Sequence, residues 1–328
     1  MNPPLVSIIV PCYNEETTIR LLLEAIFQQT YPRTAMEVLI ADGLSTDQTR
    51  SKVTAFQINH AQPPITIIDN PKRIIPSALN VALEASHGEI IVRLDAHSMP
   101  DETYISRCVE ALEQHKGDNI GGVWEIRPGG TGWQASAIAA AAAHPLGVGD
   151  ALYRYTHTAG SVDTVPFGAF RKDLIHAIGP FDETLLTNED YEFNVRVRQH
   201  GGRVWLDPAI RSVYFARSTL AALAQQYWRY GYWKSRMLRR YPKTLRWRQA
   251  LPPVFVLSLL VLALLAPWSG LARWLLLAEG SLYLLILLAA ATQIVYRHKD
   301  VTNLIGAPLA MATMHLAWGS GFLWSLLK

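Results

Sequence analysis

Acidic and imidazole side chains follow apolar segments of this sequence at the points where those segments end. Glu15 follows the first segment, Asp42 ends the second, and Asp95 and His97 follow the run Ile90–Val92. Carboxylate oxygens are the ligands that hard divalent cations prefer, and a cation can hold a diphosphate. These residue types therefore predict a site for a phosphorylated ligand that is bound through a divalent cation.

The elements that must position these side chains alternate between strands and helices. The expected strands are Leu5–Val10, Glu37–Asp42, Ile65–Asn70 and Glu89–Asp95, and the expected helices are a first one that begins after Asn14–Thr17, then 47–58, 76–85 and 101–115. Alternation of this kind predicts a parallel sheet that is covered on both faces. Because ligands bind beyond the carboxyl ends of such strands, the polar strand ends define one edge of a cleft.

The middle of the chain follows a less regular pattern. The segments Gly121–Ile126, Thr164–Phe170 and Arg203–Leu206 are expected to be strands, and Glu189–His200 is expected to be a helix that Gly201-Gly202 ends. We expect the sheet to become mixed in this region.

Several function classes lack their sequence signatures. The chain has no GxGxxG after its first strand and no GxxxxGK[ST], which argues against a dinucleotide-binding domain and a P-loop. Its two cysteines, Cys12 and Cys108, are far apart in sequence and do not support a disulfide framework or a zinc knuckle, so reduced thiols are expected. The N-terminus shows no signal peptide, and we expect the first part of the chain to stay in the cytosol.

The C-terminal part of the sequence is nearly all apolar, although 17% of the whole chain is charged. Leu251–Trp268, Leu271–Tyr296 and Asn303–Leu327 are each long enough to cross about 30 Å of hydrocarbon as a helix, so about three membrane spans are predicted. The basic residues before the first span and in Arg297–Lys299 place the N-terminal part in the cytosol and the C-terminus outside. The alternative is a buried helical subdomain.

The segment before these spans is basic and aromatic. No acidic residue lies between Asp207 and Glu279, whereas the basic residues there include Arg229, Lys234, Arg236, Arg239, Arg240, Lys243, Arg246 and Arg248. Aromatic and basic residues just before an apolar span favour an interfacial helix on anionic lipid over a nucleic-acid site. The predicted division is therefore a catalytic domain over 1–225, an interfacial segment over 226–250 and a membrane domain over 251–328.

Four motifs then give the sequence a specific likeness. "VSIIVPCYNE", "IADGLSTDQT", "RLDAH" and "TNEDYEFNVR" occur in the order and at about the spacing found in family 2 glycosyltransferases. The chain also resembles, through "DTVPFGAFRKD" and "QYWRYGYWK", the membrane-anchored glucosyltransferases of succinoglycan-type exopolysaccharide biosynthesis. The resemblance covers about Val6 to Lys234 and implies the α/β fold called GT-A, a Rossmann-like and mostly parallel sheet.

The resemblance assigns the first two strand ends to the nucleoside of a nucleotide sugar. It implies that Glu15, after Pro11 and Tyr13, faces the nucleoside and that Asp42 hydrogen-bonds the uracil ring. The common family form has two acids before a glycine, and Gly43 stands at the position of the second acid.

The later motifs are assigned to the leaving group and the acceptor. Asp95 matches the first acid of the DxD signature that holds the metal, the ribose and the diphosphate, and His97 stands at the position of the second acid. Asp190 matches the base that deprotonates the acceptor hydroxyl in an inverting transfer. Arg229 lies in a variant of the QxxRW motif, with Tyr230 in place of Trp, and would neutralise the leaving diphosphate.

Together these expectations describe an inner-membrane, multi-pass, inverting hexosyltransferase with its catalytic domain in the cytosol. It would use Mn²⁺ or Mg²⁺ and move a hexose, with UDP-glucose the expected donor, to a lipid-linked saccharide, with no nucleic-acid partner. We expect a preference for Mn²⁺ if His97 is a ligand, because imidazole suits softer ions. The alternatives are a polyprenyl-phosphate sugar synthase and a membrane scaffold or nucleotide-sugar-binding protein without catalysis.

Overall fold

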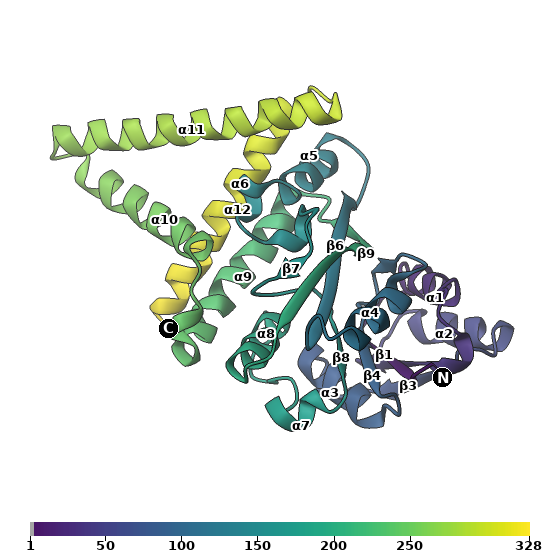
Figure 1. The fold of residues 1–328 in the computed structure, drawn as a ribbon. Helices are drawn as coiled ribbons and strands as arrows, with labels where there is room; N and C mark the ends of the chain where they lie inside the picture. Colours follow the sequence, from purple (N-terminus) through teal and green to yellow (C-terminus); the bar gives the residue numbers. More distant parts are fainter. Residues whose placement is uncertain (1–2) are drawn as a thin grey trace. The chain divides into compact units, whose positions relative to one another are not determined.

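The computed structural model describes residues 3–328, which form two compact units (Figure 1). The first unit consists of the chain up to Glu125 together with Tyr155–Tyr214, and the second consists of Ile126–Arg154 and Phe215–Lys328. Each unit therefore combines two separate segments of the chain. The predicted catalytic domain ran without interruption to residue 225, whereas the structure groups 126–154 with the C-terminal helices.

The elements of the first unit follow the predicted alternation. Its strands are β1 (Val6–Cys12), β2 (Met36–Asp42), β3 (Ile65–Asp69), β4 (Ile90–Arg93), β5 (Met99–Pro100), β7 (Gly160–Ser161) and β8 (Ala169–Arg171). Its helices are α1 (Ile19–Phe27), the 3-10 turn η1 (Arg33–Ala35), α2 (Thr49–Asn59), α3 (Ile75–Ala85), α4 (Tyr104–Glu113), α7 (Leu174–Ile178) and α8 (Glu189–Gln199). Two further strands, β6 (Asn119–Pro128) and β9 (Val204–Ala216), run from the first unit into the second.

The described strands form one mixed sheet in the order β3-β2-β1-β4-β8-β6-β9-β5, with β7 beside β9. The strands β3, β2, β1 and β4 are parallel to their neighbours in this series. From β8 onward the recorded pairings are antiparallel, as they are for β4 with β8 and for β6 with β8. The prediction of a parallel sheet that becomes mixed is therefore confirmed.

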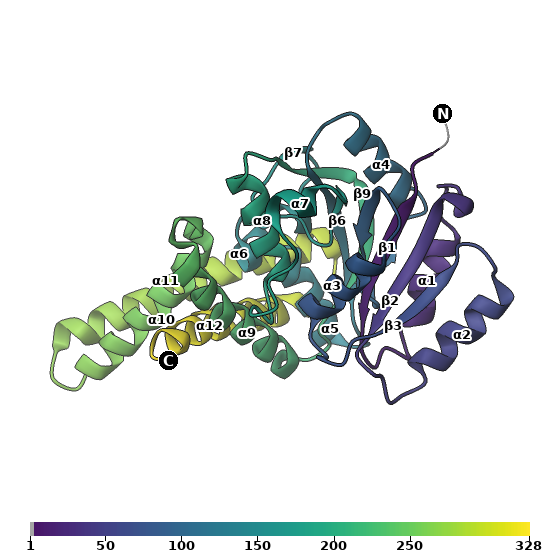
Figure 2. The same cartoon turned by 90° about the horizontal axis from the view of Figure 1, so that it is seen from below.

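Helices cover both faces of the sheet in the first unit. The apolar side chains of α1, α2 and α4 form one core with alternate residues of the strands, such as Ile8, Val38 and Val92. Figure 2 shows these helices and strands from below. On the opposite face, α3 packs against β1 and β2. Phe193 of α8 packs against Phe170 of β8. The inner parallel strands β1, β2 and β4 are thus buried, as their continuous apolar composition predicts, whereas the edge strand β3 is partly exposed.

Several element bounds differ from the sequence expectation for local reasons. The strand β4 ends at Arg93, so Asp95 and His97 lie in the loop that follows. The strand β8 begins only at Ala169, because Phe167 and Gly168 have φ values of 62° and 102° and break the extended chain before it. The strand β9 is much longer than the expected four residues and extends to Ala216.

The second unit is helical. Its elements are α5 (Trp133–Ala142), α6 (Pro145–Val148), the 3-10 turn η2 (Leu152–Arg154), α9 (Leu220–Arg240), the 3-10 turn η3 (Pro242–Thr244), α10 (Trp247–Leu265), α11 (Gly270–His298) and α12 (Asn303–Leu326). The helix α12 lies along α9 and also packs against α5 (Figure 1). The approach of α9 and α12 requires glycine, because a Cβ at Gly231 would lie 2.1 Å from the carbonyl oxygen of Trp318.

Two helices among residues 3–328, α10 and α11, are long and apolar enough to cross a membrane, which is one fewer than the predicted three. The third expected span, α12, is interrupted by polar and small residues that lower its hydropathy. Its glycines contact other helices: a Cβ at Gly321 would lie 2.2 Å from the carbonyl oxygen of Trp228 on α9. The helix α12 therefore packs on a polar helix, since α9 contains Arg229, Lys234, Arg236, Arg239 and Arg240.

Candidate active site

The strand register brings the predicted strand-end residues to one edge of the sheet. Cys12 at the end of β1 pairs with Asp42 of β2, and Asp42 pairs in turn with Asp69 of β3. Leu94, directly after β4, donates its backbone N–H to the carbonyl oxygen of Ile9. The loops that carry Glu15, Asp42 and Asp95 therefore begin side by side, as the parallel arrangement predicts.

Asp42 is almost completely buried and its carboxylate already has protein partners. Its Oδ2 accepts hydrogen bonds from the backbone N–H of Ser45 at 2.9 Å and from Nε of Arg50 at 2.5 Å. The second arm of Arg50 pairs with Asp69, so this guanidinium joins the ends of β2 and β3. The predicted contact between Asp42 and uracil would have to replace or share one of these partners.

Tyr13 is the exposed aromatic side chain at this edge, and Gly43 lies against it. A Cβ at position 43 would lie 3.0 Å from Cδ2 of Tyr13 and 3.2 Å from its Cβ. This crowding gives a physical reason for glycine where the common family form has a second acid. The guanidinium of Arg73 lies 5.8 Å from the centre of the Tyr13 ring. Pro11, in contrast, lies within β1 as a sheet residue.

Glu15 and His97 form a pair across the ends of β1 and β4. Nδ1 of His97 lies 3.0 Å from Oε1 of Glu15, and Thr18 donates its hydroxyl to the other oxygen of Glu15 at 2.5 Å. Burial disfavours the charged form of Glu15, yet the hydrogen bonds from His97 and Thr18 bring its pKa below the ordinary value. Nδ1 faces Glu15, so a metal ligand from His97 would have to be Nε2.

Asp95 lies in a tight turn at the end of β4. Its carbonyl oxygen accepts the backbone N–H of Ser98 at 2.9 Å and the hydroxyl of Ser98 at 2.7 Å. Its carboxylate is partly exposed, and Oδ1 lies 3.3 Å from Nη2 of Arg93. The turn fixes the backbone, and the Asp95 side chain is 25% exposed at this edge of the sheet.

The donor set at this edge suits a hard cation that is bound together with a substrate. No three His, Cys, Asp or Glu side chains in residues 3–328 gather closely enough to hold a metal ion by themselves. Mn²⁺ and Mg²⁺ in nucleotide sites take one or two carboxylates and complete their coordination with phosphate and water. Asp95 fits that role as a partly exposed oxygen ligand, and His97 can add at most one nitrogen.

The predicted base, Asp190, is half-buried at the start of α8, beside the buried residues Glu189 and Arg93. Its neighbour Glu189 is 5% exposed and its Oε1 accepts a hydrogen bond from Nη2 of Arg93 at 2.8 Å. Burial raises the pKa of Asp190, and the positive charge of Arg93 opposes this shift. Burial raises the pKa of Glu189 in the same way. A base with a raised pKa accepts a proton more readily near neutral pH.

Hydrogen bonds hold α8 in place behind this cluster. Nδ2 of Asn194 donates to the hydroxyl of Thr164 at 3.1 Å, and its Oδ1 accepts from Asn119 of β6 at 2.7 Å. Asn188, just before the helix, has a φ of 69°, and all three first-turn acids of the helix follow it. An acidic first turn is favoured by the helix dipole, so the position of Asp190 and Glu189 is consistent with local helix physics as well as with chemistry.

Arg229 lies on α9 in the second unit, and its side chain is exposed. In the same variant motif, Nε2 of Gln226 donates to the hydroxyl of Tyr230 at 2.9 Å, which orders this helix turn. The role of Arg229 at the diphosphate stays a prediction.

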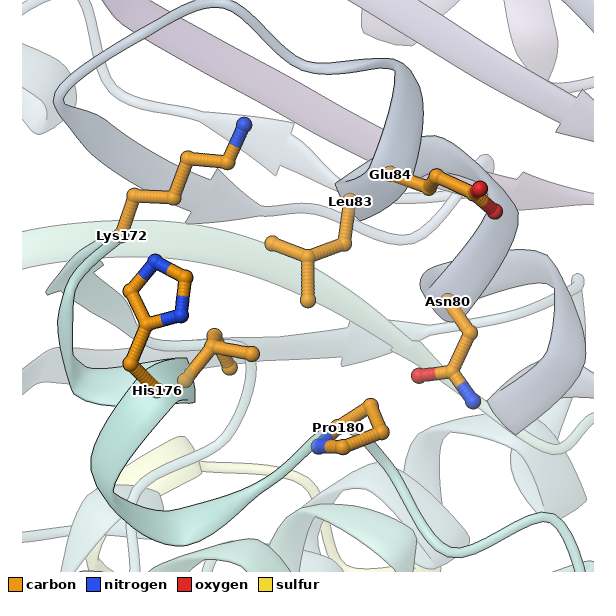
Figure 3. A pocket seen from close by; sticks show the side chains of 7 residues that line it. Asn80, Leu83, Glu84, Lys172, His176 and Pro180 are labelled. Carbon is orange, nitrogen blue, oxygen red and sulfur yellow. The ribbon is translucent and has the colours of Figure 1, made fainter.

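A cavity of about 350 Å³ opens elsewhere in the first unit, between α3 and the segment that contains α7 (Figure 3). Its lining residues are Asn80, Leu83, Glu84, Lys172, Ile175, His176 and Pro180. None of the predicted site residues is among them. Nζ of Lys172 donates to the carbonyl oxygen of Ser86, and Asn80 donates to that of Phe181 at 2.9 Å. These polar groups serve the packing of α3, and we assign the cavity no part in the site.

The mixed sheet, with acids at the ends of its parallel strands, has the GT-A fold that solved glycosyltransferase structures share. Residues 7–179 match the model of "Glycosyl transferase family 2", and the chain belongs to that family. It is 30% identical to the succinoglycan biosynthesis protein ExoA of Rhizobium meliloti (strain 1021), over 96% of this chain and 93% of that protein.

Two further proteins extend this likeness along nearly the whole chain. A dolichyl N-acetyl-alpha-D-glucosaminyl phosphate 3-beta-D-2,3-diacetamido-2,3-dideoxy-beta-D-glucuronosyltransferase of Methanococcus voltae is 26% identical over 98% of this chain and 97% of its own length. The mannosyltransferase PcManGT of Pyrobaculum calidifontis, solved with GDP-Man and Mn²⁺, superposes with a TM-score of 0.65 at 22% identity, covering 96% of this chain and 88% of that one.

Sequence reasoning missed two residues of this edge, Arg50 and Arg93. Arg50 joins Asp42 to Asp69, and Arg93 joins Asp95 to Glu189. Arg93 carried a detectable signal, because an arginine at the end of a continuous apolar strand is costly to bury unless carboxylates face it. Arg50 lies on a polar helix and carried no comparable signal.

Proposed function

We propose that this glycosyltransferase moves a hexose, with inversion, from UDP-glucose to a lipid-linked saccharide during exopolysaccharide biosynthesis. The observation that carries the proposal is the cluster at the start of α8, where Asp190 and Glu189 lie near Arg93, which in turn contacts Asp95. The printed name of the Rhizobium meliloti relative supports exopolysaccharide as the product class, and that of the Methanococcus voltae relative supports a lipid-linked acceptor.

In the proposed reaction, Asp190 is the general base. The acceptor hydroxyl oxygen attacks the anomeric carbon from the face opposite the diphosphate, and its proton passes to a carboxylate oxygen of Asp190. The bond between the anomeric carbon and the diphosphate oxygen breaks with its electron pair on the diphosphate. The raised pKa of Asp190 strengthens it as a base, and no covalent intermediate with the protein is required.

Asp95 is proposed to hold the cation on the leaving-group side. A bound divalent cation supplies positive charge that stabilises the departing diphosphate. The exposed Arg229 is proposed to add a second positive charge. The Glu15 carboxylate orients the His97 ring through Nδ1, so that Nε2 can face either the cation or a phosphate oxygen.

The role of His97 can be tested directly. If Nε2 is a ligand, the enzyme should prefer Mn²⁺ over Mg²⁺, and His97→Asp should reduce that preference. Mn²⁺ affinity measured by electron paramagnetic resonance with UDP present is the readout. Equal rates in the two metals, together with an unchanged Mn²⁺ affinity of His97→Asp, would leave His97 as a phosphate contact only.

On the donor side, Tyr13, Glu15 and Asp42 are proposed to line the nucleoside pocket with the backbone at Pro11. Tyr13 offers an exposed ring face, and Asp42 is held rigidly by Ser45 and Arg50. Replacement of Tyr13 by alanine should weaken UDP binding, because base stacking on an aromatic ring contributes about 1–3 kcal/mol. Isothermal titration with UDP measures this loss.

The proposed location is the inner membrane, with the first unit in the cytosol. We propose that α10 and α11 cross as a hairpin and that α12 returns to lie along α9 on the cytosolic side. In inverted vesicles, whose cytosolic face points outward, added protease should then remove a tag placed after Lys328. Removal of the tag only in right-side-out vesicles would instead support the three spans expected from the sequence.

The activity test uses the purified full-length protein with radiolabelled UDP-glucose, GDP-mannose or UDP-GlcNAc and a membrane lipid fraction. Transfer of label to lipid supports the proposal, and absence of labelled lipid with every donor would contradict it. Asp190→Asn should lower the rate by about 100- to 10,000-fold, as expected for loss of a general base, while UDP still binds.

Two alternatives give different outcomes in the same assay. Mild acid releases a single labelled sugar if the product is a polyprenyl-phosphate sugar, and a larger glycan if the acceptor is a lipid-linked saccharide. A protein that binds UDP-sugars with no turnover, whose Asp190→Asn variant behaves like the parent, would be a nucleotide-sugar-binding or scaffold protein.

A further inference from the structure

We propose that Arg93 is a positioning residue, which fixes the start of α8, and so the base Asp190, relative to Asp95 at the end of β4. This inference rests on the proposed function, because it takes Asp190 as the base and Asp95 as the cation ligand. It assigns a role to a residue that contacts Asp95 and Glu189, the residue next to Asp190, and to which the family resemblance assigned no function.

One atom of Arg93 makes both contacts. Nη2 lies 2.8 Å from Oε1 of Glu189 and 3.3 Å from Oδ1 of Asp95. Arg93 and Glu189 are each about 5% exposed or less, whereas the Asp95 carboxylate is partly open. The guanidinium is therefore a buried bridge between a carboxylate at the cleft edge and the residue directly before Asp190.

The two ends of this bridge differ in rigidity. The strand β4 lies inside the sheet, with β1 on one side and β8 on the other. The helix α8 begins only at Glu189, directly after Asn188 in the left-handed conformation. A helix start has backbone N–H groups without helical partners, so tertiary contacts must fix its direction. Arg93 makes such a contact with the first residue of the helix.

The side chain of Arg93 makes fewer hydrogen bonds than a buried arginine that only stabilises the fold would be expected to make. Within the described chain, Nε and Nη1 of Arg93 are buried and have no hydrogen-bond partner. Arg196, on the same helix, shows the other pattern: it makes two bonds to Glu192, at 2.7 and 2.8 Å, and its Nη1 donates to two carbonyl oxygens. A buried charge with incomplete bonding costs stability, and the contacts that Arg93 does make are with Asp95 and Glu189, on the two sides of the proposed site.

The test compares Arg93→Lys with Arg196→Lys in the full-length enzyme. Lysine keeps the positive charge and supports folding, but it is a single ammonium in place of the planar guanidinium and cannot reproduce this geometry. We expect Arg93→Lys to lower kcat by about 100-fold, the scale of a 1 Å misplacement of reacting groups, with donor KM and UDP affinity within about threefold of the parent. Arg196→Lys should leave kcat unchanged, although both variants lower the melting temperature.

A double-variant cycle tests whether Arg93 acts through Glu189. Glu189→Gln should also slow kcat, and the combination with Arg93→Lys should be no slower than the slower single variant, because both remove the same bridge. Multiplying effects would overturn the inference, and so would an Arg93→Lys variant with parental kcat or one whose UDP affinity falls as much as its kcat. A parent enzyme that transfers no sugar would overturn the proposed function first, and the inference with it.

Discussion

Phe193 links the stability of the first unit to the helix that carries the proposed base, and its removal should be costly. Its ring is 2% exposed and lies 4.7 Å from the ring of Phe181 and 5.0 Å from that of Phe170, measured between centroids. Replacement of a buried Phe by Ala costs about 3–5 kcal/mol of unfolding free energy through lost burial and a residual cavity. For a unit of this size, each kcal/mol lowers the melting temperature by about 2–4 °C, so Phe193→Ala should lower it by about 6–20 °C.

The measurement is thermal unfolding of the full-length protein in detergent, followed by near-ultraviolet circular dichroism. Phe193→Leu keeps most of the apolar volume and should lower the melting temperature by much less than Phe193→Ala. The surface control is Ile58→Ala, since Ile58 is 79% exposed on α2, and its melting temperature should stay within about 2 °C of the parent. A shift below about 3 °C for Phe193→Ala would refute the reasoning, because it would mean that the aromatic stack contributes little to the core.

Three further outcomes follow from the structure. Because burial raises the pKa of Asp190, the acid limb of the pH profile of kcat/KM should lie above the ordinary aspartate pKa of about 3.9, and a limb at or below pH 4 would contradict the assignment. The same shift means that protonation of Asp190 stabilises the folded protein at low pH, and that this stabilisation is lost as the pH rises through the raised pKa. Gly231→Leu should separate α12 from α9 and make α12 sensitive to proteolysis, whereas Gly280→Leu, which has open space around its Cβ, should not. Burial raises the pKa of Cys12 and Cys108, so maleimide should label neither in the folded protein at pH 7 and both after denaturation; rapid labelling of the native protein would show that the thiols are accessible.

The positions of the strand ends could be predicted from the sequence. The inner parallel strands are mainly apolar runs, and the polar residues at or just after their ends mark the carboxyl edge of the sheet, as for Asp42 and Asp95. The family resemblance then added roles that no spacing could supply. The position of Asp190 at a helix start also followed from the sequence, since three acids in a first turn are a strong local signal.

The pairings between those residues could not be predicted, because they depend on three-dimensional proximity. Nothing in the sequence indicates that His97 faces Glu15, or that Arg50 joins two strands. The extent of β9 was also hidden, because Pro208 within it argues against a strand, although an exposed or irregular strand position accepts proline. The expected count of about three membrane helices stays a prediction, because length and apolar composition do not show that the glycines of α12 meet another helix.

The interleaved chain path of the helical unit has a consequence for how the protein is made. Residues 126–154 leave the ribosome long before their partner α12, which packs against both α5 and α9. The helices α10 and α11, which are the candidate membrane spans, are synthesised between these two events. The face of α9 that contains Gly231 therefore stays uncovered until α12 has been synthesised. A nonsense mutation at residue 300 would produce a chain that keeps every strand of the sheet but leaves this face of α9 without its partner helix. Degradation by cellular quality control, more than loss of catalysis, would then decide how much of this truncated protein remains.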